Sequence, residues 1–400
     1  MSAAKIVIVG AARTPIGAIG GGLSSIDPSN LIVKIATAAL AHAKCDLEHI
    51  EYITIGQCMQ DMRNMNIARM TGVRIGAPVS APATTVQENC STGGAAIHDI
   101  ARRILCGEIG LGVAGGVESM STIPRVLFTG RTKGQLYGDM KIIDGLQGAL
   151  QDPTVGKNGT LMGLLTEALA EKYKVSRELQ DEIAFRSHKN ACETWDKGWF
   201  DYVVPVEVPD KKKPFVVSRD EGPKKLDMEY FQKQKAYFKV DGTGTITSAT
   251  ASTVNDGAAA LVIASEKRAK ELELPILAEL KAFGNIGVPR EYMGEGVFKV
   301  FPKLFQRANI KLADVDYFEL NEAFAAVVGA ATKEYPELKL DKVNQWGSGI
   351  SLGHPLGCTG ARQVVDMCHQ LHRRNAHLGV TTRCVGGGMG SGEVLVRYEK

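Results

Sequence analysis

The sequence predicts an α/β layer fold in which one structural unit occurs twice, with a helical and loop-rich lobe inserted into the first copy. Three observations support this prediction. Short apolar runs typical of strands alternate with helical stretches at both ends of the chain. The second half repeats the spacing of the first. Residues 121–246, in contrast, contain few apolar runs and many lysines.

Length and composition limit the class of protein. Four hundred residues, 44% of them hydrophobic, suit a soluble protein of two or three domains. A net charge of only +3 argues against an extended nucleic-acid-binding surface. No apolar run reaches the length of a membrane span, and the first residues lack the charged and apolar regions of a secretory signal. We therefore expect no nucleic-acid partner, no membrane span and a cytoplasmic location.

The eight cysteines are expected to be free thiols. No CxxC pair occurs among them, so the sequence predicts no zinc or other metal site. A reducing compartment is consistent with this use of cysteine.

The first copy begins with elements that alternate regularly. A loop follows the first strand, and its Gly10, Ala12 and Arg13 do not fit the GxGxxG spacing of a dinucleotide-binding turn. Periodic apolar residues then predict two helical stretches, and short β-prone runs predict two further strands. The predicted strands are 6–10, 52–56 and 111–116, and the predicted helices are 31–43 and a stretch that begins at Asn66.

The inserted lobe contains two amphipathic stretches, 161–173 and 177–197. Its three lysines at 211–213 predict a solvated surface, with contact to ligand phosphates as the alternative. An apolar strand at 255–264 then resumes the first copy. The predicted domains are therefore 1–121 plus 248–272 for the first half, 122–247 for the inserted lobe and 273–400 for the second half.

The internal repeat has a constant offset of 267 residues. Thr92 stands 19 positions before Leu111, and Thr359 stands 19 positions before Leu378. Four apolar helix positions match at the same offset: Ile97 with Val364, Ile100 with Met367, Ala101 with Cys368 and Ile104 with Leu371. We expect the two copies to pack face to face about a pseudo-twofold axis. The helix after Cys90 and its mate, which starts just past Gly357, would then be neighbours at the centre.

Cys90 lies where a β-prone run changes into this helix. The N-terminus of a helix presents unpaired N–H groups and the positive end of the helix dipole, which stabilise a thiolate and lower its pKa. The sequence therefore indicates a reactive nucleophile at Cys90. The alternative is a buried cysteine that packs as a small hydrophobic side chain.

Three segments of the second half are candidates to meet Cys90. His354 lies between Gly353 and Pro355 just before the second-copy helix, where it is placed to act as a base, although a lone histidine is more often structural. Cys384 precedes three glycines whose N–H groups are exposed; the alternative is a strand turn with an idle thiol. Asn321 follows a predicted strand at 317–320, and either orients an oxygen or caps a helix.

These motifs together resemble the thiolase family of CoA-dependent 3-ketoacyl-thiolases and acetyl-CoA acetyltransferases. The family carries Cys-Ser-x-Gly, Asn-Glu-Ala-Phe, Gly-His-Pro-x-Gly and Cys-x-Gly-Gly-Gly motifs, which occur here in the same order at Cys90, Asn321, His354 and Cys384. The resemblance covers nearly the whole chain. It implies the duplicated, five-layered αβαβα thiolase fold with an inserted loop domain.

The resemblance also implies a role for each site residue. Cys90 would attack the thioester and carry the acyl group, and His354 would accept its proton. Cys384 would be the second acid and base, acting on the methyl carbon of acetyl-CoA. Asn321, through a water, and His354 would stabilise the enolate oxygen. The N–H groups of Cys90 and Gly386 would form the other oxyanion hole.

By the same resemblance, coenzyme A is substrate and product, no cofactor is permanently bound, and the chain forms a homodimer or homotetramer. CoA would lie between the inserted lobe and the core, with Lys224 near the nucleotide. The residues expected along the pantetheine arm are Ser252, Ala251, Met162, Met293 and Phe324, and Leu161 is expected in the same substrate site.

The acyl chain length is left open by the residues. Leu161 stands where short-chain members carry a histidine, which argues against acetoacetyl-CoA, whereas the segment 138–144 resembles the short-chain loop. Asn89 and Arg383 also depart from the family pattern; Arg383 is expected to point away from the Cys384 thiol, or else to select an unusual acyl group. The prediction is a reversible Claisen condensation and thiolysis of short-chain substrates, with a longer-chain degradative thiolase as the alternative.

Two alternative functions are less compatible with these residues. A carrier-protein-dependent ketoacyl synthase of the same fold would carry a second His or an Asn in place of Cys384. A non-catalytic CoA-binding subunit would not need Cys90, His354 and Cys384 together.

Overall fold

The computed structural model describes residues 4–60, 62–127, 139, 141–210 and 212–399. One sheet path runs through both halves in the order β14-β15-β16-β13-β1-β12-β5-β3-β4, with β2 paired to β12. The first half comprises β1 (Ile6–Arg13), β2 (Gly17–Ala18), α1 (Pro28–Ala43), β3 (Tyr52–Gly56), α2 (Ile67–Ile75), β4 (Ala83–Val86), α3 (Thr92–Leu105), β5 (Leu111–Ser119), β12 (Asn255–Ser265) and α8 (Glu266–Glu271). The second half comprises β13 (Ala278–Gly287), α9 (Gly296–Lys299), α10 (Phe301–Ala308), β14 (Tyr317–Leu320), α11 (Ala325–Glu334), α12 (Leu356–Arg373), β15 (Leu378–Val385) and β16 (Met389–Arg397).

The pairing register confirms the duplication. Strand β5 begins at Leu111 and β15 begins at Leu378, which keeps the offset of the sequence repeat. Each is flanked by a parallel strand in the same register, with Tyr52 opposite Gly112 in the first half and Tyr317 opposite Gly379 in the second. The other neighbour, β12 or β16, is antiparallel in both halves.

Three large apolar cores separate the layers. In β1, Val7 and Val9 belong to the core under α1, whereas Ile6 and Ile8 belong to the central core that contains α3 and α12. This division follows from the alternation of side chains along a strand. A third core lies between the second-half strands and helices α9, α10 and α11. The resulting order of layers is the αβαβα order of the prediction.

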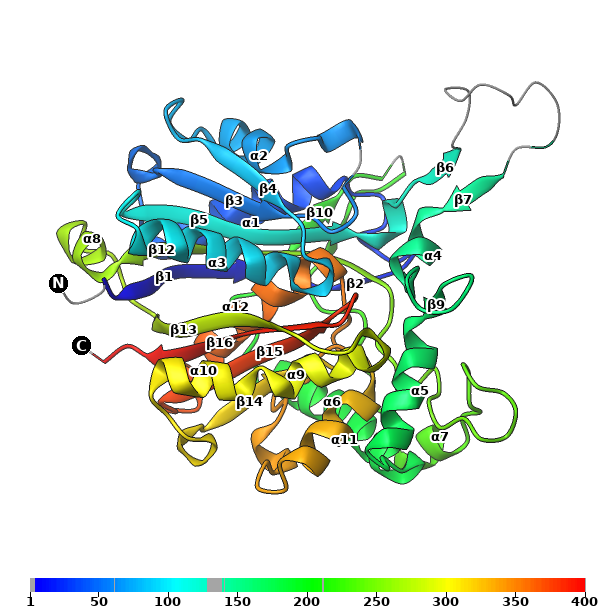
Figure 1. Cartoon of the computed structure of the whole chain (residues 1–400). Helices are drawn as coiled ribbons and strands as arrows, with labels where there is room; N and C mark the ends of the chain where they lie inside the picture. The colour runs from blue at the N-terminus through cyan, green and yellow to red at the C-terminus, as the bar shows by residue number, and fades with distance from the viewer. Residues whose placement is uncertain (1–3, 61, 128–138, 140, 211, 400) are drawn as a thin grey trace.

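The central layer is formed by the two helices that the repeat relates. Figure 1 shows α3 and α12 between the strands of the two halves. Their backbones approach at glycines: a Cβ built on Gly360 would lie 2.4 Å from the backbone N of Gly94, and one on Gly93 would lie 2.7 Å from that of Ala361. Glycine is required there because any side chain would separate the helices.

The segment between β5 and β12 leaves the sheet and returns to the same place, since Ser119 pairs with Asp256. Its elements are β6 (Arg125–Leu127), β7 (Ile142–Asp144), α4 (Gly145–Ala149), β8 (Gln151–Asp152), β9 (Thr160–Leu161), α5 (Met162–Lys172), α6 (Arg177–Asp196), β10 (Val206–Val208), β11 (Phe215–Val217) and α7 (Met228–Gln232). Helices α5 and α6 pack against α11 of the second half. The exact division of the chain into domains stays a prediction.

Two sequence predictions in this segment concern residues of which only a part is described. Lys212 and Lys213 are exposed and their N–H groups bond to Asp210, which is consistent with a solvated surface, while Lys211 lies outside the described residues. Gly138 and Met140 of the segment 138–144 also lie outside them, whereas its residues Ile142–Asp144 form β7. Within the described ranges, no helix combines the length and apolarity that a bilayer crossing requires.

The helix contact predicts a large cost for Gly360→Ala. The new methyl group would collide with the backbone N of Gly94 and with Nη1 of the buried Arg383, so we expect the free energy of unfolding to fall by roughly 3 kcal/mol. Urea unfolding followed by circular dichroism measures this. Gly148→Ala is the control, because its Cβ would meet no atom within 4 Å; an equal loss in both variants would contradict the proposed contact.

Candidate active site

Cys90 lies at the start of the central helix α3, as predicted. A single 3-10 turn, Asn89–Ser91, lies between the edge strand β4 and helix α3. The turn is closed by Thr92, whose hydroxyl donates to the carbonyl of Asn89 at 2.7 Å and accepts the N–H of Glu88 at 2.8 Å. These bonds present the half-buried thiol at the helix N-terminus.

The prediction of a lowered Cys90 pKa is wrong. Burial raises the pKa of the thiol to about 11, although the backbone N–H groups of Gly386 and of Cys90 itself act in the opposite direction. The nearby carboxylate of Glu118 raises it further. The helix end therefore stabilises a thiolate less than burial disfavours it, and the resting thiol keeps its proton. A base is needed to remove it.

Gly386 lies in the turn between β15 and β16, and Cys384 lies near the end of β15. Gly387 and Gly388 have φ values of +90° and +83°, a region that L side chains rarely adopt. The turn thereby directs the Gly386 N–H at the Cys90 sulfur. Cys384 is buried, and both burial and the charge of a Cys90 thiolate raise its pKa well above the usual thiol value. The structure thus brings both thiols into one site.

His354 is held in place by its neighbours in the loop before α12. Gly353 has φ of +112°, and its position against Asn255 leaves no room for a side chain. The N–H of His354 donates to Asn255 Oδ1 at 3.0 Å. The side chain is buried.

Hydrogen bonds assign the tautomer of His354. The hydroxyl of Thr359 has one proton, and it donates that proton to the carbonyl of Pro355 at 3.0 Å. It must therefore accept the 2.6 Å bond from His354 Nδ1–H. This leaves the lone pair on Nε2. Burial, and then the positive charge of Arg362, lower the pKa of His354 to about 3, so the ring is neutral at physiological pH and able to accept a proton.

Asn321 joins this group from the end of β14. Its N–H donates to the carbonyl of Thr382 at 2.9 Å, two residues before Cys384. Its side-chain nitrogen lies 3.5 and 3.4 Å from the two ring nitrogens of His354, too evenly placed for a directed bond to either one. Its buried Oδ1 accepts no bond from another described residue. Asn321 thus contacts His354 and the strand of Cys384, while Cys384 and Gly386 interact with Cys90; the catalytic roles of the five residues stay predictions.

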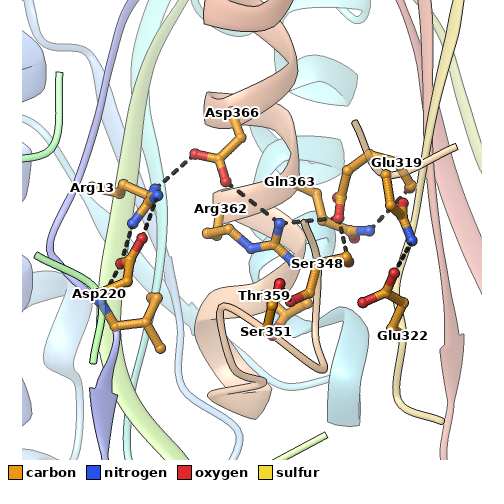
Figure 2. Close-up of polar contacts among 12 residues, drawn as sticks. Arg13, Asp220, Glu319, Glu322, Ser348, Ser351, Thr359, Arg362, Gln363 and Asp366 are labelled. Atoms are coloured by element: carbon orange, nitrogen blue, oxygen red, sulfur yellow. Dashed lines mark hydrogen bonds and ion pairs between the residues drawn. The ribbon is translucent and has the colours of Figure 1, made fainter. Parts of the chain in front are cut away.

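A buried chain of charges supports α12 behind the histidine. Arg362 contacts Glu319 at 3.0 Å and Asp366 at 3.4 Å, and Asp366 contacts Arg13 of β1 at 2.7 Å (Figure 2). Arg13 also pairs with Asp220 of the inserted segment at 2.7 Å. The chain therefore ties three parts of the fold to the helix that follows His354. No local pattern in the sequence predicts this chain of charges, because its members are far apart along the chain.

Glu118 is a second residue that the sequence analysis did not assign to the site. Its buried carboxylate accepts the N–H groups of Cys58, Met59 and Gly357 at 3.0–3.4 Å. Burial raises its pKa to about 7 even so. Its place in a segment that resembles the family, Val117–Ser121, was the only signal that could have found it.

The predicted CoA-side residues fall into two groups. Met162, Met293, Phe324 and Ala251 pack in the same apolar core as Cys384, and the Ser252 N–H donates to the carbonyl of Ala323 at 2.9 Å. Met162 Cε would lie 3.2 Å from a Cβ on Gly386. Leu161 and Lys224 are exposed, and Lys224 contacts His188 rather than any of these residues.

Arg383 does not face the acyl site. It is fully buried and pairs with Glu393, which also bonds to His98 at 2.8 Å and to Thr381 at 2.5 Å. Burial favours the neutral acid, but Arg383 and His98 hold the pKa of Glu393 below its usual value. The idea that Arg383 selects an unusual acyl group is therefore not supported. Among the described residues, no cluster of His, Cys, Asp and Glu could hold a metal ion.

A duplicated α/β fold with two thiols and a neutral imidazole at its centre defines an enzyme of thiol chemistry. Two family models identify it further: the N-terminal thiolase domain matches residues 6–267, and the C-terminal thiolase domain matches residues 274–397. The chain belongs to the thiolase family. The prediction of an acyltransferase is confirmed at the level of this family.

Individual relatives match along the full length. A probable acetyl-CoA acyltransferase of Staphylococcus epidermidis is 38% identical over 402 residues, which cover 99% of each chain. The crystal structure of Bacillus anthracis acetyl-CoA acetyltransferase superposes with a TM-score of 0.94 at 36% identity, covering 99% of each chain. The crystal structure of human mitochondrial 3-ketoacyl-CoA thiolase in complex with CoA superposes with a TM-score of 0.93 at 33% identity, covering 99% of this chain and 98% of that chain.

The Glu118 carboxylate predicts a pH effect on Cys90. Glu118→Gln removes a negative charge that raises the Cys90 pKa, so the rate of Cys90 alkylation by iodoacetamide should be several-fold higher at pH 8 and its pH profile should move to lower pH. Peptide mass spectrometry of the labelled thiol measures this. Glu108→Gln, an exposed acid paired with Arg103, is the charge-matched control.

The same variant tests a linkage to stability. Since burial raises the Glu118 pKa, the folded state binds its proton more tightly than the unfolded state does. This contribution to stability is complete below pH 4.5 and is lost as the pH rises through about 7. In Glu118→Gln, this loss of stability with rising pH should be absent. An unchanged alkylation profile together with an unchanged pH dependence of unfolding would contradict the assignment.

Proposed function

We propose that the protein is a thiolase that carries the acyl group on Cys90 and exchanges it with coenzyme A. The observation that carries the proposal is the convergence on one sulfur of two backbone N–H groups, those of Cys90 and Gly386, beside a second buried thiol. When the thiol attacks a carbonyl, the same two donors would be available for the oxyanion that forms beside the sulfur.

Thiolysis of a 3-ketoacyl-CoA begins with proton transfer from Cys90 to His354 Nε2. The Cys90 sulfur then bonds to the keto carbon, and the N–H groups of Cys90 and Gly386 hold the resulting oxyanion. When the carbon–carbon bond breaks, the enolate of acetyl-CoA takes a proton from Cys384, whose raised pKa keeps that proton available. Asn321 and His354 would stabilise the enolate oxygen, and the proximity of their side chains supports this shared role.

Transfer to coenzyme A completes the cycle. The Cys384 thiolate accepts the proton of the CoA thiol, the CoA sulfur attacks the acyl carbon, and the Cys90 sulfur leaves and recovers its proton from His354. Each residue returns to its starting state. A thiol replaces a thiol at the acyl carbon, so the free-energy change of this step is small and the enzyme can run as a condensing or a cleaving enzyme.

Short-chain substrates, with acetoacetyl-CoA as the probe, are the proposed class. An apolar cluster of Cys58, Met120 and Leu356 packs beside Cys90, with Ile123, Leu146 and Val254 at its edge, and suits an uncharged acyl group. Leu161 in place of a histidine is the observation that favours the alternative, a longer 3-ketoacyl-CoA. The proposed CoA site runs along Met162, Met293, Phe324, Ala251 and Ser252, with Lys224 near the nucleotide. We also propose that the chain forms a homodimer or homotetramer and is located in the cytoplasm.

Acetyl transfer to Cys90 is the direct test. Incubation with acetyl-CoA should add one acetyl group to the peptide that contains Cys90, and the exposed Cys106 serves as the internal control. Cys384→Ala should still form this adduct, because CoA can leave as a thiolate without the proton of Cys384. The variant should lose at least about 100-fold in thiolysis of acetoacetyl-CoA, because the carbon leaving group needs that proton. Absence of the Cys90 adduct would support a non-catalytic CoA-binding subunit instead.

Thr359 gives a further prediction for the base. Thr359→Val leaves the buried His354 Nδ1–H without an acceptor and frees the tautomer, so kcat for thiolysis should fall roughly tenfold or more with little change in KM. Thr359→Ser keeps the acceptor and should stay near the wild-type rate. Equal rates for the valine and serine variants would show that the hydroxyl does not orient the base.

A further inference from the structure

Asn89, the residue immediately before Cys90, has an unusual backbone and an unusual partner. Its φ of +44° places it in the left-handed region, which asparagine and glycine adopt more readily than other residues. Its side-chain Nδ2 donates to the carbonyl of Gly386 at 2.8 Å, across 297 positions of sequence. Its Oδ1 accepts a bond from Gln87 Nε2 at 3.2 Å, which fixes the orientation of the amide.

The turn that Asn89 contacts is held at its other end by the Val288 N–H, which donates to the carbonyl of Gly388 at 2.8 Å. Gly386, Gly387 and Gly388 have no side chains, and a Cβ built on Gly387 would meet no atom within 4 Å. Gly386 is nevertheless the residue whose N–H points at the Cys90 sulfur. The N–H of Cys90 comes from the first half of the fold and that of Gly386 from the second. Their relative position therefore depends on contacts between the halves, and the Asn89 bond is such a contact at the site itself.

We propose that Asn89 is a positioning residue that aligns the two N–H groups of the oxyanion hole by tying the Cys90 turn to Gly386. This inference rests on the proposed function of that site. It also accounts for the residue type. Glycine and aspartate tolerate the left-handed backbone, but glycine has no amide and aspartate would place a carboxylate oxygen against the Gly386 carbonyl. Asparagine provides both the backbone conformation and the donor.

The test uses the full-length protein with Asn89→Gly as the main variant, because glycine keeps the backbone conformation and removes only the amide. Single-turnover acetylation of Cys90 by acetyl-CoA should slow about 10- to 100-fold. This loss in rate does not exceed the loss expected when one oxyanion-hole donor is removed entirely. The acetyl-CoA concentration that gives the half-maximal rate should change little. Asn89→Asp should be at least as slow. Asn309→Gly, at an exposed left-handed asparagine after α10, is the matched control and should acetylate at the wild-type rate.

Alkylation of Cys90 by iodoacetamide gives a readout that does not depend on acyl transfer. The Gly386 N–H stabilises the Cys90 thiolate, so its displacement in Asn89→Gly should move the alkylation profile to higher pH. Wild-type acetylation rate and wild-type alkylation profile in Asn89→Gly would overturn the inference. If the wild-type protein forms no Cys90 adduct, the proposed function fails, and the alkylation profiles alone then decide whether Asn89 positions Gly386.

Discussion

The structure depends on the close crossing of α3 and α12. Gly93 and Gly94 on one helix and Gly360 on the other allow the two backbones to touch, and the starts of both helices therefore lie side by side between the two halves. Cys90 precedes one helix and His354 precedes the other. A wider crossing would separate the nucleophile from its base, so the packing of glycines near the starts of the two helices sets the distance on which the chemistry depends.

Burial at this crossing decides the charge state of the site. The thiol of Cys90 stays protonated and the imidazole of His354 stays neutral, in both cases because the charged form is disfavoured away from water. A resting thiolate–imidazolium pair is therefore not what this fold favours. Proton transfer must accompany attack on the carbonyl, when the oxyanion hole begins to stabilise the developing negative charge.

The sequence was sufficient for the fold and for the central residues because these leave local or periodic signals. The repeat at 267 positions predicted the paired helices, and four short motifs predicted Cys90, Asn321, His354 and Cys384. The Cys90 pKa was misjudged because a helix terminus can be recognised from sequence, whereas the burial that outweighs it cannot. Thr359 and Arg362 were missed as partners of His354 for a similar reason, since the contacts form only when α12 is wound.

The two departures from the family pattern beside the cysteines have different physical explanations. Arg383 is accommodated inside the protein: the glycines at the helix crossing leave space for its guanidinium, as a Cβ on Gly94 or Gly360 would lie 2.6 or 2.5 Å from Nη1, and Glu393 neutralises its charge. Removing either partner would leave a buried charge unpaired, so the pair must change together. The Asn89 side chain instead contacts the carbonyl of Gly386. One departure thus belongs to the interior of the fold, and the other lies where the two halves meet at the reacting sulfur.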